Sequence, residues 1–261
     1  MPATIAAIVA KLGNAARRFD IDVLPSCDST NAVLLARAEA GAPSGTVVIA
    51  EEQTAGRGRR GRSWFSSPGD SLTFSLLWRF APGTAPAGLS LAVGVAVARA
   101  LQKVGAGDAA LKWPNDILKQ GRKLGGILVE LVPGAPHAAV IGIGINLQLP
   151  PGMPDYVRAA SAAIGAIDAA GVVADSNALY AALLGELLAT LESFGSAGFA
   201  ALRPEWLARH AFQDVPVSIA SDFGAPVVGI CRGVDGDGAL LLDVDGRIER
   251  ILSGEVSLRR A

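Results

Sequence analysis

The stretch Gly56-Arg57-Gly58-Arg59-Arg60-Gly61-Arg62 decides between two fold classes, because it matches the G-x-G-x-x-G pattern of a dinucleotide-binding loop. In a Rossmann fold this loop opens a helix, whereas the next residues, Ser63-Trp64-Phe65-Ser66-Ser67-Pro68-Gly69, cannot readily continue as one. A Rossmann loop also neutralises pyrophosphate with backbone N–H groups and a helix dipole, without four guanidinium groups. The sequence therefore argues against a Rossmann fold.

The arginines of this loop indicate instead a flexible cover that closes over a strongly anionic ligand. Glycine allows close backbone approach, and arginine makes bidentate contacts with phosphate. Two plainer interpretations stay open, a solvated basic loop and an RNA-binding arginine–glycine tract. Trp64, just behind the loop, either stacks on a base or fills core.

Composition limits these alternatives. The chain has 261 residues, 51% of them hydrophobic, and its 23 basic and 24 acidic residues give a net charge of −1. A generic nucleic-acid coat protein would be strongly basic, and so large an apolar fraction argues against disorder. The length suits one large domain or two unequal ones that need no disulfide or metal staple. Cys27 and Cys231 lack metal-ligand spacing, and we expect two reduced, mostly buried thiols.

Hydrophobic periodicity and turn signals divide the chain into a larger and a smaller part. In the larger part we expect helices at 3–19, 31–39 and 89–104, an Ala-rich helical stretch at 159–210, and strands at 21–24, 46–50, 72–80, 111–113, 117–119, 124–131 and 138–147. Residues 53–69 are expected to form a long loop. In the smaller part we expect strands at 215–220, 227–232, 239–243, 247–252 and 256–258. Five short strands in so short a segment predict a small barrel, with a domain boundary near residue 212.

A second constellation, Lys112-Trp113-Pro114-Asn115-Asp116, joins a strand to a tight turn. Pro114 forces Trp113 into an extended conformation, which fixes the positions of Lys112 and Asp116. A lysine for phosphate charge and an aspartate for Mg²⁺ are what nucleotide chemistry needs. An Asx-type turn with a surface lysine is the plainer alternative.

Two apolar strands carry glycines, Gly121-Arg122-Lys123-Leu124-Gly125-Gly126 and Gly142-Ile143-Gly144-Ile145-Asn146. Glycine within a strand marks either the close approach of a ligand or a bulge. Lys123 stands just before the paired glycines of the first run. Asn146 ends the second run with a polar group that could meet a metal or a phosphate.

Taken in order, these motifs resemble those of biotin protein ligases, from about residue 20 to the end of the chain. The elements that carry the resemblance are Asp28-Ser29-Thr30-Asn31, Gln53, the Gly56–Arg62 loop with Trp64, Lys112–Asp116, Arg122–Gly126 with Val129-Glu130, Gly142–Asn146 and the terminal Gly254–Arg259. The ordered set is highly specific. It implies an α/β (α+β) fold in which a mixed β-sheet backed by helices, a class II synthetase-like catalytic domain at 1–212, precedes a small SH3-like barrel at 213–261.

The resemblance also implies a two-step reaction. The biotin carboxylate attacks the α-phosphorus of ATP, with Mg²⁺ as cofactor, and gives biotinyl-5′-AMP and pyrophosphate. A lysine of a biotin carboxyl carrier domain, the partner in a biotin-dependent carboxylase, then takes the biotin and AMP leaves. A lipoate–protein ligase is the nearest alternative, but that family lacks the glycine–arginine loop in this form. A nucleic-acid-binding module is the alternative from another class.

Residue roles are carried over position by position as implications of the resemblance. The catalytic residues are Lys123, Arg59 and Lys112, with Lys123 supplying the main catalytic charge. The biotin site comprises Ser29, Thr30, Gln53, Gly56, Arg57, Arg59, Lys123, Gly126 and Gly144. The ATP and adenylate site comprises Asn31, Arg60, Gly61, Arg62, Trp64, Lys112, Asn146 and Arg259. The Mg²⁺ ligands are Asp116 and Asn146.

The start of the chain departs from part of that family. Only a helix and a strand precede Asp28, which is too little for the winged-helix domain of bifunctional members, so no specific DNA binding is expected. The first residues lack the basic segment of a signal peptide, and no apolar run approaches the roughly 18 residues needed to cross a bilayer. We therefore expect a monofunctional, cytoplasmic protein without membrane contact, either a monomer or a ligand-dependent homodimer.

Overall fold

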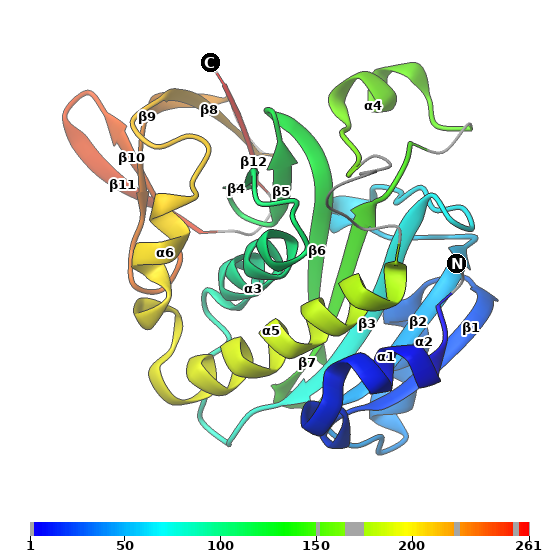
Figure 1. Ribbon diagram of the computed structural model, residues 1–261. Coiled ribbons are helices and arrows are strands. Elements are labelled where there is room, and N and C mark those ends of the chain that lie inside the picture. Colours follow the sequence, from blue (N-terminus) through cyan, green and yellow to red (C-terminus); the bar gives the residue numbers. More distant parts are fainter. Residues whose placement is uncertain (1–2, 150–151, 165–174, 222–224, 253–255, 261) are drawn as a thin grey trace.

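The chain forms a seven-stranded mixed sheet followed by a five-stranded antiparallel sheet, as the computed structural model in Figure 1 shows. The structure describes residues 3–149, 152–164, 175–221, 225–252 and 256–260. The strands of the large sheet are β1 (Asp20–Cys27), β2 (Thr46–Gln53), β3 (Ser71–Arg79), β4 (Ala109–Lys112), β5 (Asp116–Lys119), β6 (Arg122–Val132) and β7 (Ala135–Asn146). They lie in the order β1-β2-β3-β7-β6-β5-β4. β1 and β2 are parallel, and every later pair is antiparallel.

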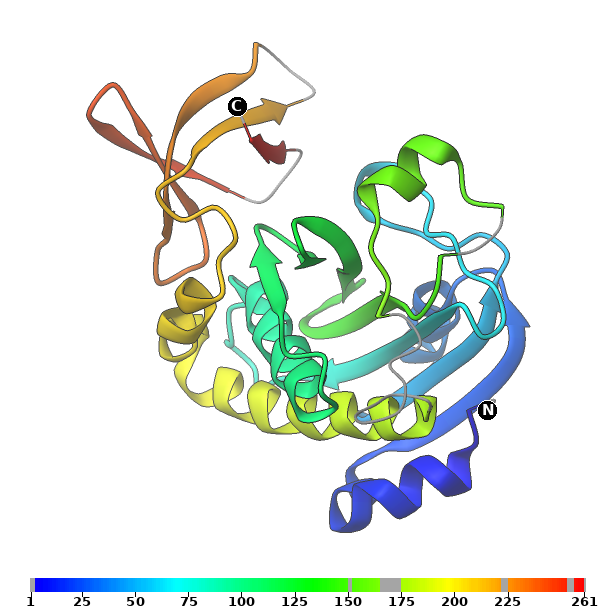
Figure 2. The ribbon, with the colours of Figure 1, turned by 45° about the horizontal axis from the view of Figure 1, so that its top comes forward.

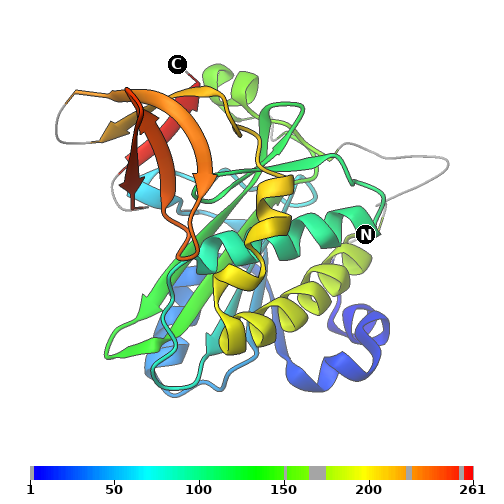
Figure 3. The same ribbon diagram turned by 90° about the vertical axis from the view of Figure 1, so that its left-hand side faces the viewer.

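Helices cover the two faces of this sheet unequally. The helices are α1 (Ile5–Leu12), α2 (Thr30–Glu39), α3 (Leu89–Lys103), α4 (Asp155–Ala160), α5 (Ser176–Ala197) and α6 (Arg203–Ala208). α3 and α5 run side by side over one face, with α1 beside α5 (Figures 1 and 3). α2 packs on the opposite face against β2 and β3. That second face is therefore left open beyond α2, and the candidate site lies there.

Strand alternation decides which side chains reach each face, because successive residues of a strand point in opposite directions. On β3, Phe74 and Leu76 join the core under α3 and α5, whereas Leu77 packs under α2. On β7 the isoleucines at 141, 143 and 145 face the same large core. The glycines between them, Gly142 and Gly144, therefore lie on the face that carries the candidate site.

The C-terminal sheet contains the five strands expected from the sequence, in the order β11-β10-β9-β8-β12. They are β8 (Pro216–Ser221), β9 (Val227–Val234), β10 (Leu240–Val244), β11 (Arg247–Ile251) and β12 (Val256–Arg260). Figure 2 shows this sheet beyond α6, to one side of the large sheet. Among the described contacts between the parts, the Trp113 indole donates to the Gly238 carbonyl at 3.1 Å and the Arg203 guanidinium donates to the Val234 carbonyl at 2.6 Å. Leu111 also pairs with Arg209 and Ala211 of the linker, just before the C-terminal sheet.

The Ala-rich stretch at 159–210 is not one helical region, so that expectation is wrong. α4 ends at Ala160, Ser161 forms a bridge to Lys123, and the next described helix begins at Ser176. Alanine content favours helix, but the buried backbone pairing of residues 161–164 with β6 and β7 overrides it. Residues 165–174 lie outside the described part of the chain.

The first helix is also shorter than predicted. α1 ends at Gly13, whose φ of 57° lies in the left-handed region, and a 3₁₀ turn continues to Arg18. Of the apolar residues in this helix, Ile8 is fully buried, whereas Ile5 and Val9 are exposed.

α5 is the one helix in the described residues that is long and apolar enough to cross a membrane by length and composition. Its Leu183, Leu187 and Leu191 are completely buried against the rest of the protein. It is therefore used as a core helix. Cys27, half-buried, and Cys231, buried, are both free thiols.

Candidate active site

A cavity of about 690 Å³ lies on the open face of the large sheet. That volume is in the range of small-molecule and cofactor sites. Its walls come from the start of α2, the end of β2, the arginine loop, the β4–β5 turn, β6, β7 and the segment around α4. Leu258 of β12 also reaches it, so both sheets contribute to the wall.

The long loop expected at 53–69 is present between the end of β2 and the start of β3 at Ser71, and the arginine-rich part of it folds into a tight hairpin-like turn. β2 continues to Gln53, Arg57 pairs with Ser63, and the Gly58 amide donates to the Arg62 carbonyl at 2.7 Å. Arg60, with φ of 59°, turns the chain at the tip. β3 then runs antiparallel to β2, which excludes the parallel crossover of a Rossmann loop, as predicted.

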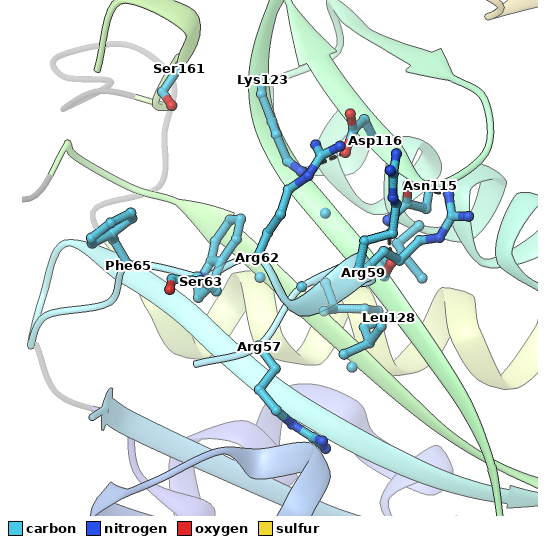
Figure 4. A pocket seen from close by; sticks show the side chains of 18 of the residues that line it. Arg57, Arg59, Arg62, Ser63, Phe65, Asn115, Asp116, Lys123, Leu128 and Ser161 are labelled. Atoms are coloured by element: carbon cyan, nitrogen blue, oxygen red, sulfur yellow. Dashed lines mark hydrogen bonds and ion pairs between the residues drawn. The ribbon is translucent and has the colours of Figure 1, made fainter. Parts of the chain in front are cut away.

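Cationic side chains converge on Asp116, which begins β5. Lys123 of β6 lies 2.6 Å from one carboxylate oxygen, and Lys112 of β4 lies 3.7 Å from the other. In Figure 4, Arg62 also extends from the loop toward this pair, while Arg57 points the opposite way. One carboxylate therefore holds several cations that would otherwise repel one another. Their combined charge faces the cavity and favours an anionic ligand.

Burial lowers the pKa values of two cationic side chains that line the cavity, Lys112 and Arg59. The pKa of Lys112 is lowered chiefly because burial penalises the ammonium, an effect that Asp116 opposes and Lys123 reinforces. The pKa of Arg59 is also lowered, mainly by burial, and Asp116 again opposes the shift. A bound anion would raise these pKa values again, because an opposite charge nearby stabilises the charged form that burial disfavours.

A polar network lies at the other end of the cavity. Gln53 accepts from both the Thr30 amide, at 2.8 Å, and the Thr30 hydroxyl, at 3.1 Å. Both bonds use the Gln53 oxygen, so its amide nitrogen is the end left for a ligand. Behind it, the hydroxyl of fully buried Ser75 contacts Thr30 and Asn31. These residues fix the donors and acceptors that an uncharged polar ligand group would meet.

The glycines Gly126, Gly142 and Gly144 form what we call the glycine floor, since Gly126 pairs directly with Gly144 across β6 and β7. A side chain at Gly144 would lie 2.5 Å from the Trp64 indole, and one at Gly142 would overlap the Asn31 amide. The space left by the missing side chains of Gly144 and Gly142 is therefore occupied by Trp64 and Asn31, respectively. The buried Trp64 indole nitrogen lines the cavity without a hydrogen-bond partner among the described residues.

Asp116 and Asn146 both line the cavity and suit Mg²⁺ by chemistry, because this ion prefers oxygen ligands and is completed by substrate phosphates. The Asn146 side-chain nitrogen donates to the Ala162 carbonyl at 2.9 Å, while its buried oxygen has no partner among the described residues. That orphaned oxygen fits a cation ligand. No group of three or more His, Cys, Asp or Glu gathers anywhere in the described chain, so the protein alone offers few ligands.

Nearly all of the predicted site residues meet in this one cavity. Gly56 is not among the described residues that line it. Its carbonyl accepts from the Trp64 amide, and a side chain there would strike the Trp64 backbone. Arg259 lies on β12 beside Leu258, opposite Ser218, but its side chain is outside the described part.

Sequence reasoning missed one wall. Met153, Tyr156, Val157, Ala160 and Ser161 line the cavity opposite the arginine loop. Tyr156 is 79% exposed, which is unusual for a large aromatic side chain at a cavity mouth. The prolines before this segment and the alanines within it indicated only a loop followed by a helix, and not a binding surface. The isolated aromatic residue among small side chains was the only available cue.

A mixed sheet with a cation-lined cavity under an arginine hairpin defines an α/β enzyme with a site for an anionic substrate. The model described as the Biotin/lipoate A/B protein ligase family matches residues 23–146, and the one described as Biotin protein ligase C terminal domain matches residues 216–259. The chain belongs to the biotin protein ligases of this family and is therefore a ligase.

Individual relatives agree with this membership. The chain is 44% identical to the bifunctional ligase/repressor BirA of Escherichia coli over 92% of this chain and 74% of that protein. It is 38% identical to a biotin–[acetyl-CoA-carboxylase] ligase of Mycobacterium tuberculosis, over 90% of this chain and 88% of that one. A biotin protein ligase from Aquifex aeolicus, solved with biotin and ATP, superposes with a TM-score of 0.78 at 28% identity, covering 93% and 99% of the two chains.

Proposed function

We propose that this ligase attaches biotin to a lysine of a biotin carboxyl carrier domain in two steps at the cavity described above. In the first step a biotin carboxylate oxygen attacks the α-phosphorus of ATP, and the bond to the pyrophosphate oxygen breaks. In the second, the carrier's lysine amine attacks the acyl carbon of biotinyl-5′-AMP, and AMP leaves. The convergence of Lys112, Lys123 and Arg62 on Asp116 is the observation that carries this proposal.

Lys123 is the proposed main catalytic charge. Its ammonium lies over Gly126, where an added side chain would come within 3.3 Å of it, so no side chain shields it from the glycine floor. It can stabilise the negative charge that builds up as carboxylate and phosphate meet, and later polarise the mixed anhydride. Lys112 would bind ATP phosphates, and Arg59 would contact both biotin and the adenylate phosphate.

The polar network and the loop divide the remaining roles. Ser29, Thr30 and Gln53 would hydrogen-bond the ureido ring of biotin, with Arg57 near its other polar edge. Gly126 and Gly144 have no side chains that would fill the space above this end of the sheet. Gly56 allows the loop backbone to pack against Trp64. Asn31, Arg60, Gly61, Arg62 and Trp64 would border the adenylate, with Arg259 reaching the nucleotide from β12.

Mg²⁺ would be held by Asp116 and Asn146 together with the phosphates of ATP. When bound, it would offset the charge of the leaving pyrophosphate. Asp116 meanwhile holds Lys112 and Lys123 at the same end of the cavity.

The remaining parts of the proposal concern the whole chain. We assign biotin and ATP binding to a catalytic domain at 1–212 and place a second domain at 213–261. The carrier of a biotin-dependent carboxylase is the proposed partner, because the Mycobacterium tuberculosis relative is named for acetyl-CoA carboxylase. We propose a cytoplasmic enzyme, either monomeric or dimerising with ligand, without specific DNA binding.

Transfer of radiolabelled biotin onto a biotin carboxyl carrier domain, with and without MgATP, tests the proposal directly. We expect acid-stable label on the carrier only when MgATP is present, and none on a carrier whose acceptor lysine is replaced by arginine. Excess lipoate should not compete, since its dithiolane ring lacks the ureido donors and acceptor that Thr30 and Gln53 would meet. Absence of MgATP-dependent label would refute the proposed reaction.

A further inference from the structure

Glu130, on β6, joins two parts of the site through a single carboxylate oxygen. Its Oε2 atom accepts from the Asn31 side-chain amide at 2.7 Å and from the Arg57 guanidinium at 3.1 Å. Asn31 belongs to the polar network at the start of α2, and Arg57 is the first arginine of the loop. One carboxylate oxygen therefore binds the network and the loop at once.

The Asn31 side of this junction is rigid. Asn31 is buried, its oxygen accepts from the Ser75 hydroxyl, and its nitrogen also donates to the Leu128 carbonyl at 3.2 Å. The missing side chain of Gly142 leaves the space that its amide fills. A buried amide with all these partners has one orientation, so it fixes the Glu130 carboxylate in turn.

The Arg57 side of the junction is the base of the hairpin. Arg57 pairs with Ser63 where the two arms of the loop meet, so its position sets where the tip arginines lie. Its side chain extends away from Lys123 and Asp116 (Figure 4) and is 45% exposed, whereas the Glu130 side chain is only 27% exposed. The partly buried carboxylate anchors the more exposed arginine.

We infer that Glu130 is a positioning residue, which aligns Arg57 and the base of the arginine loop with the polar network that would hold biotin. This inference rests on the substrate role proposed for Arg57. Glu130 is not among the described residues that line the cavity, so it acts on substrate through Arg57, while Asn31 fixes the Glu130 carboxylate. An isolated surface ion pair would contribute little, but this carboxylate also satisfies a buried amide, and its geometry is therefore fixed.

A double-mutant cycle of Glu130→Ala and Arg57→Met tests the inference in the full-length enzyme, with biotin-dependent ATP–pyrophosphate exchange as the assay. We expect each single variant to raise the KM for biotin about three- to tenfold, less than a fully buried charge-assisted hydrogen bond would give because the Arg57 side chain is 45% exposed, with the KM for ATP changed less than about twofold. Because Glu130 acts through Arg57, the double variant should be no worse than Arg57→Met alone.

Two controls accompany the cycle. Glu130→Gln keeps an acceptor for Asn31 without the charge, so it should fold normally and shift the KM for biotin by about two- to threefold in the same direction. Asp22→Asn breaks a comparable exposed pair with Arg37, 2.7 Å apart, and should leave both KM values unchanged.

The outcomes separate the two claims. If Arg57→Met leaves the KM for biotin at the wild-type value, the proposed role of Arg57 fails and the inference fails with it. If Arg57→Met raises this KM but neither Glu130 variant does, the inference alone is overturned. Effects that multiply in the double variant would also overturn it, because Glu130 would then act independently of Arg57.

Discussion

At the scale of single residues, Asp116 controls how much positive charge the cavity can hold. Lys112 and Lys123 both lie against its carboxylate, and the pKa of Lys112 is still lowered by burial. Without that carboxylate, two ammonium groups would face each other with little solvent to screen them. Asp116 therefore stabilises the two ammonium groups in the absence of an anionic substrate.

Lys123→Ala should abolish biotin-dependent ATP–pyrophosphate exchange, by at least about 100-fold, because it removes the charge placed where carboxylate and phosphate meet. The fold should persist, since the Lys123 ammonium is at the cavity and its structural bonds to Ala162 and Asn146 use the backbone carbonyl. Exchange measured beside a far-ultraviolet circular dichroism spectrum checks both statements. Lys11→Ala, which removes an exposed lysine paired with Asp175, is the control. Near-normal exchange in Lys123→Ala would remove Lys123 from its proposed role.

The lowered pKa of Lys112 predicts an alkaline limb in the pH profile of kcat/KM for ATP. Because the proposed ligand of the ATP phosphates is the Lys112 ammonium of the free enzyme, the rate should fall as the pH rises through a pKa below the ordinary 10.5 of lysine. Lys112→Arg should move this limb upward, because a guanidinium stays charged above pH 12. The position of the limb, and not the height of the profile, is the measurement. Superimposable limbs in the two proteins would assign the titration to another group.

At the scale of elements, the arginine loop is a hairpin between two antiparallel strands, and it places its tip over the glycine floor. The short 3₁₀ turn at Arg59–Gly61 brings Arg59 within 3.5 Å of the Asn115 oxygen, and Asn115 is fixed by its bond to Ile127. We expect a loop anchored in this way to cover the bound intermediate and exclude water from it.

Arg59→Ala should shorten the lifetime of enzyme-bound biotinyl-5′-AMP by about tenfold, the value of one hydrogen bond to a charged group. A loosened cover admits water and lets the intermediate escape. Release of adenylate from a pulse-loaded enzyme, without carrier, measures this lifetime. Arg37→Ala, in the last turn of α2 and outside the residues that line the cavity, should match the wild type. An unchanged lifetime in Arg59→Ala would count against a covering role for the loop.

Elements with a strong local pattern could be predicted from the sequence, and contacts between distant segments could not. The strands expected at 117–119 and 124–131 do form, as β5 and β6, and the short turn between them is local, since Gln120 and Gly121 adopt the two positive φ angles that it requires. The break after Ala160 was not predicted, because it depends on pairing between residues 161–164 and strands earlier in the chain. For the same reason, the motifs identified the cavity residues, but the junction at Glu130 and the position of Tyr156 needed the folded chain.

At the scale of the whole molecule, the two sheets meet beside the cavity. Trp113, buried next to Pro114, donates to Gly238 of the C-terminal part, and the linker pairs with Leu111 next to Lys112. Phe212 of the same linker lies 5.9 Å from the Lys112 ammonium, within the range of a cation–π contact. Ligand binding at Lys112 is therefore physically connected to both parts, and both should be stabilised together.

Biotin with MgATP should raise the melting temperature of the entire chain in a single transition. A ligand at 100 times its Kd stabilises the native state by about 2.7 kcal/mol, which corresponds to about 5–10 °C for a chain of this size. A single-stranded oligonucleotide at the same concentration should change the melting temperature by less than about 1 °C, because the net charge of −1 leaves no broad basic face. Differential scanning fluorimetry at physiological salt makes the comparison, with biotin or MgATP alone as intermediate conditions. Stabilisation by the oligonucleotide alone would reassign the arginine loop to nucleic-acid phosphates.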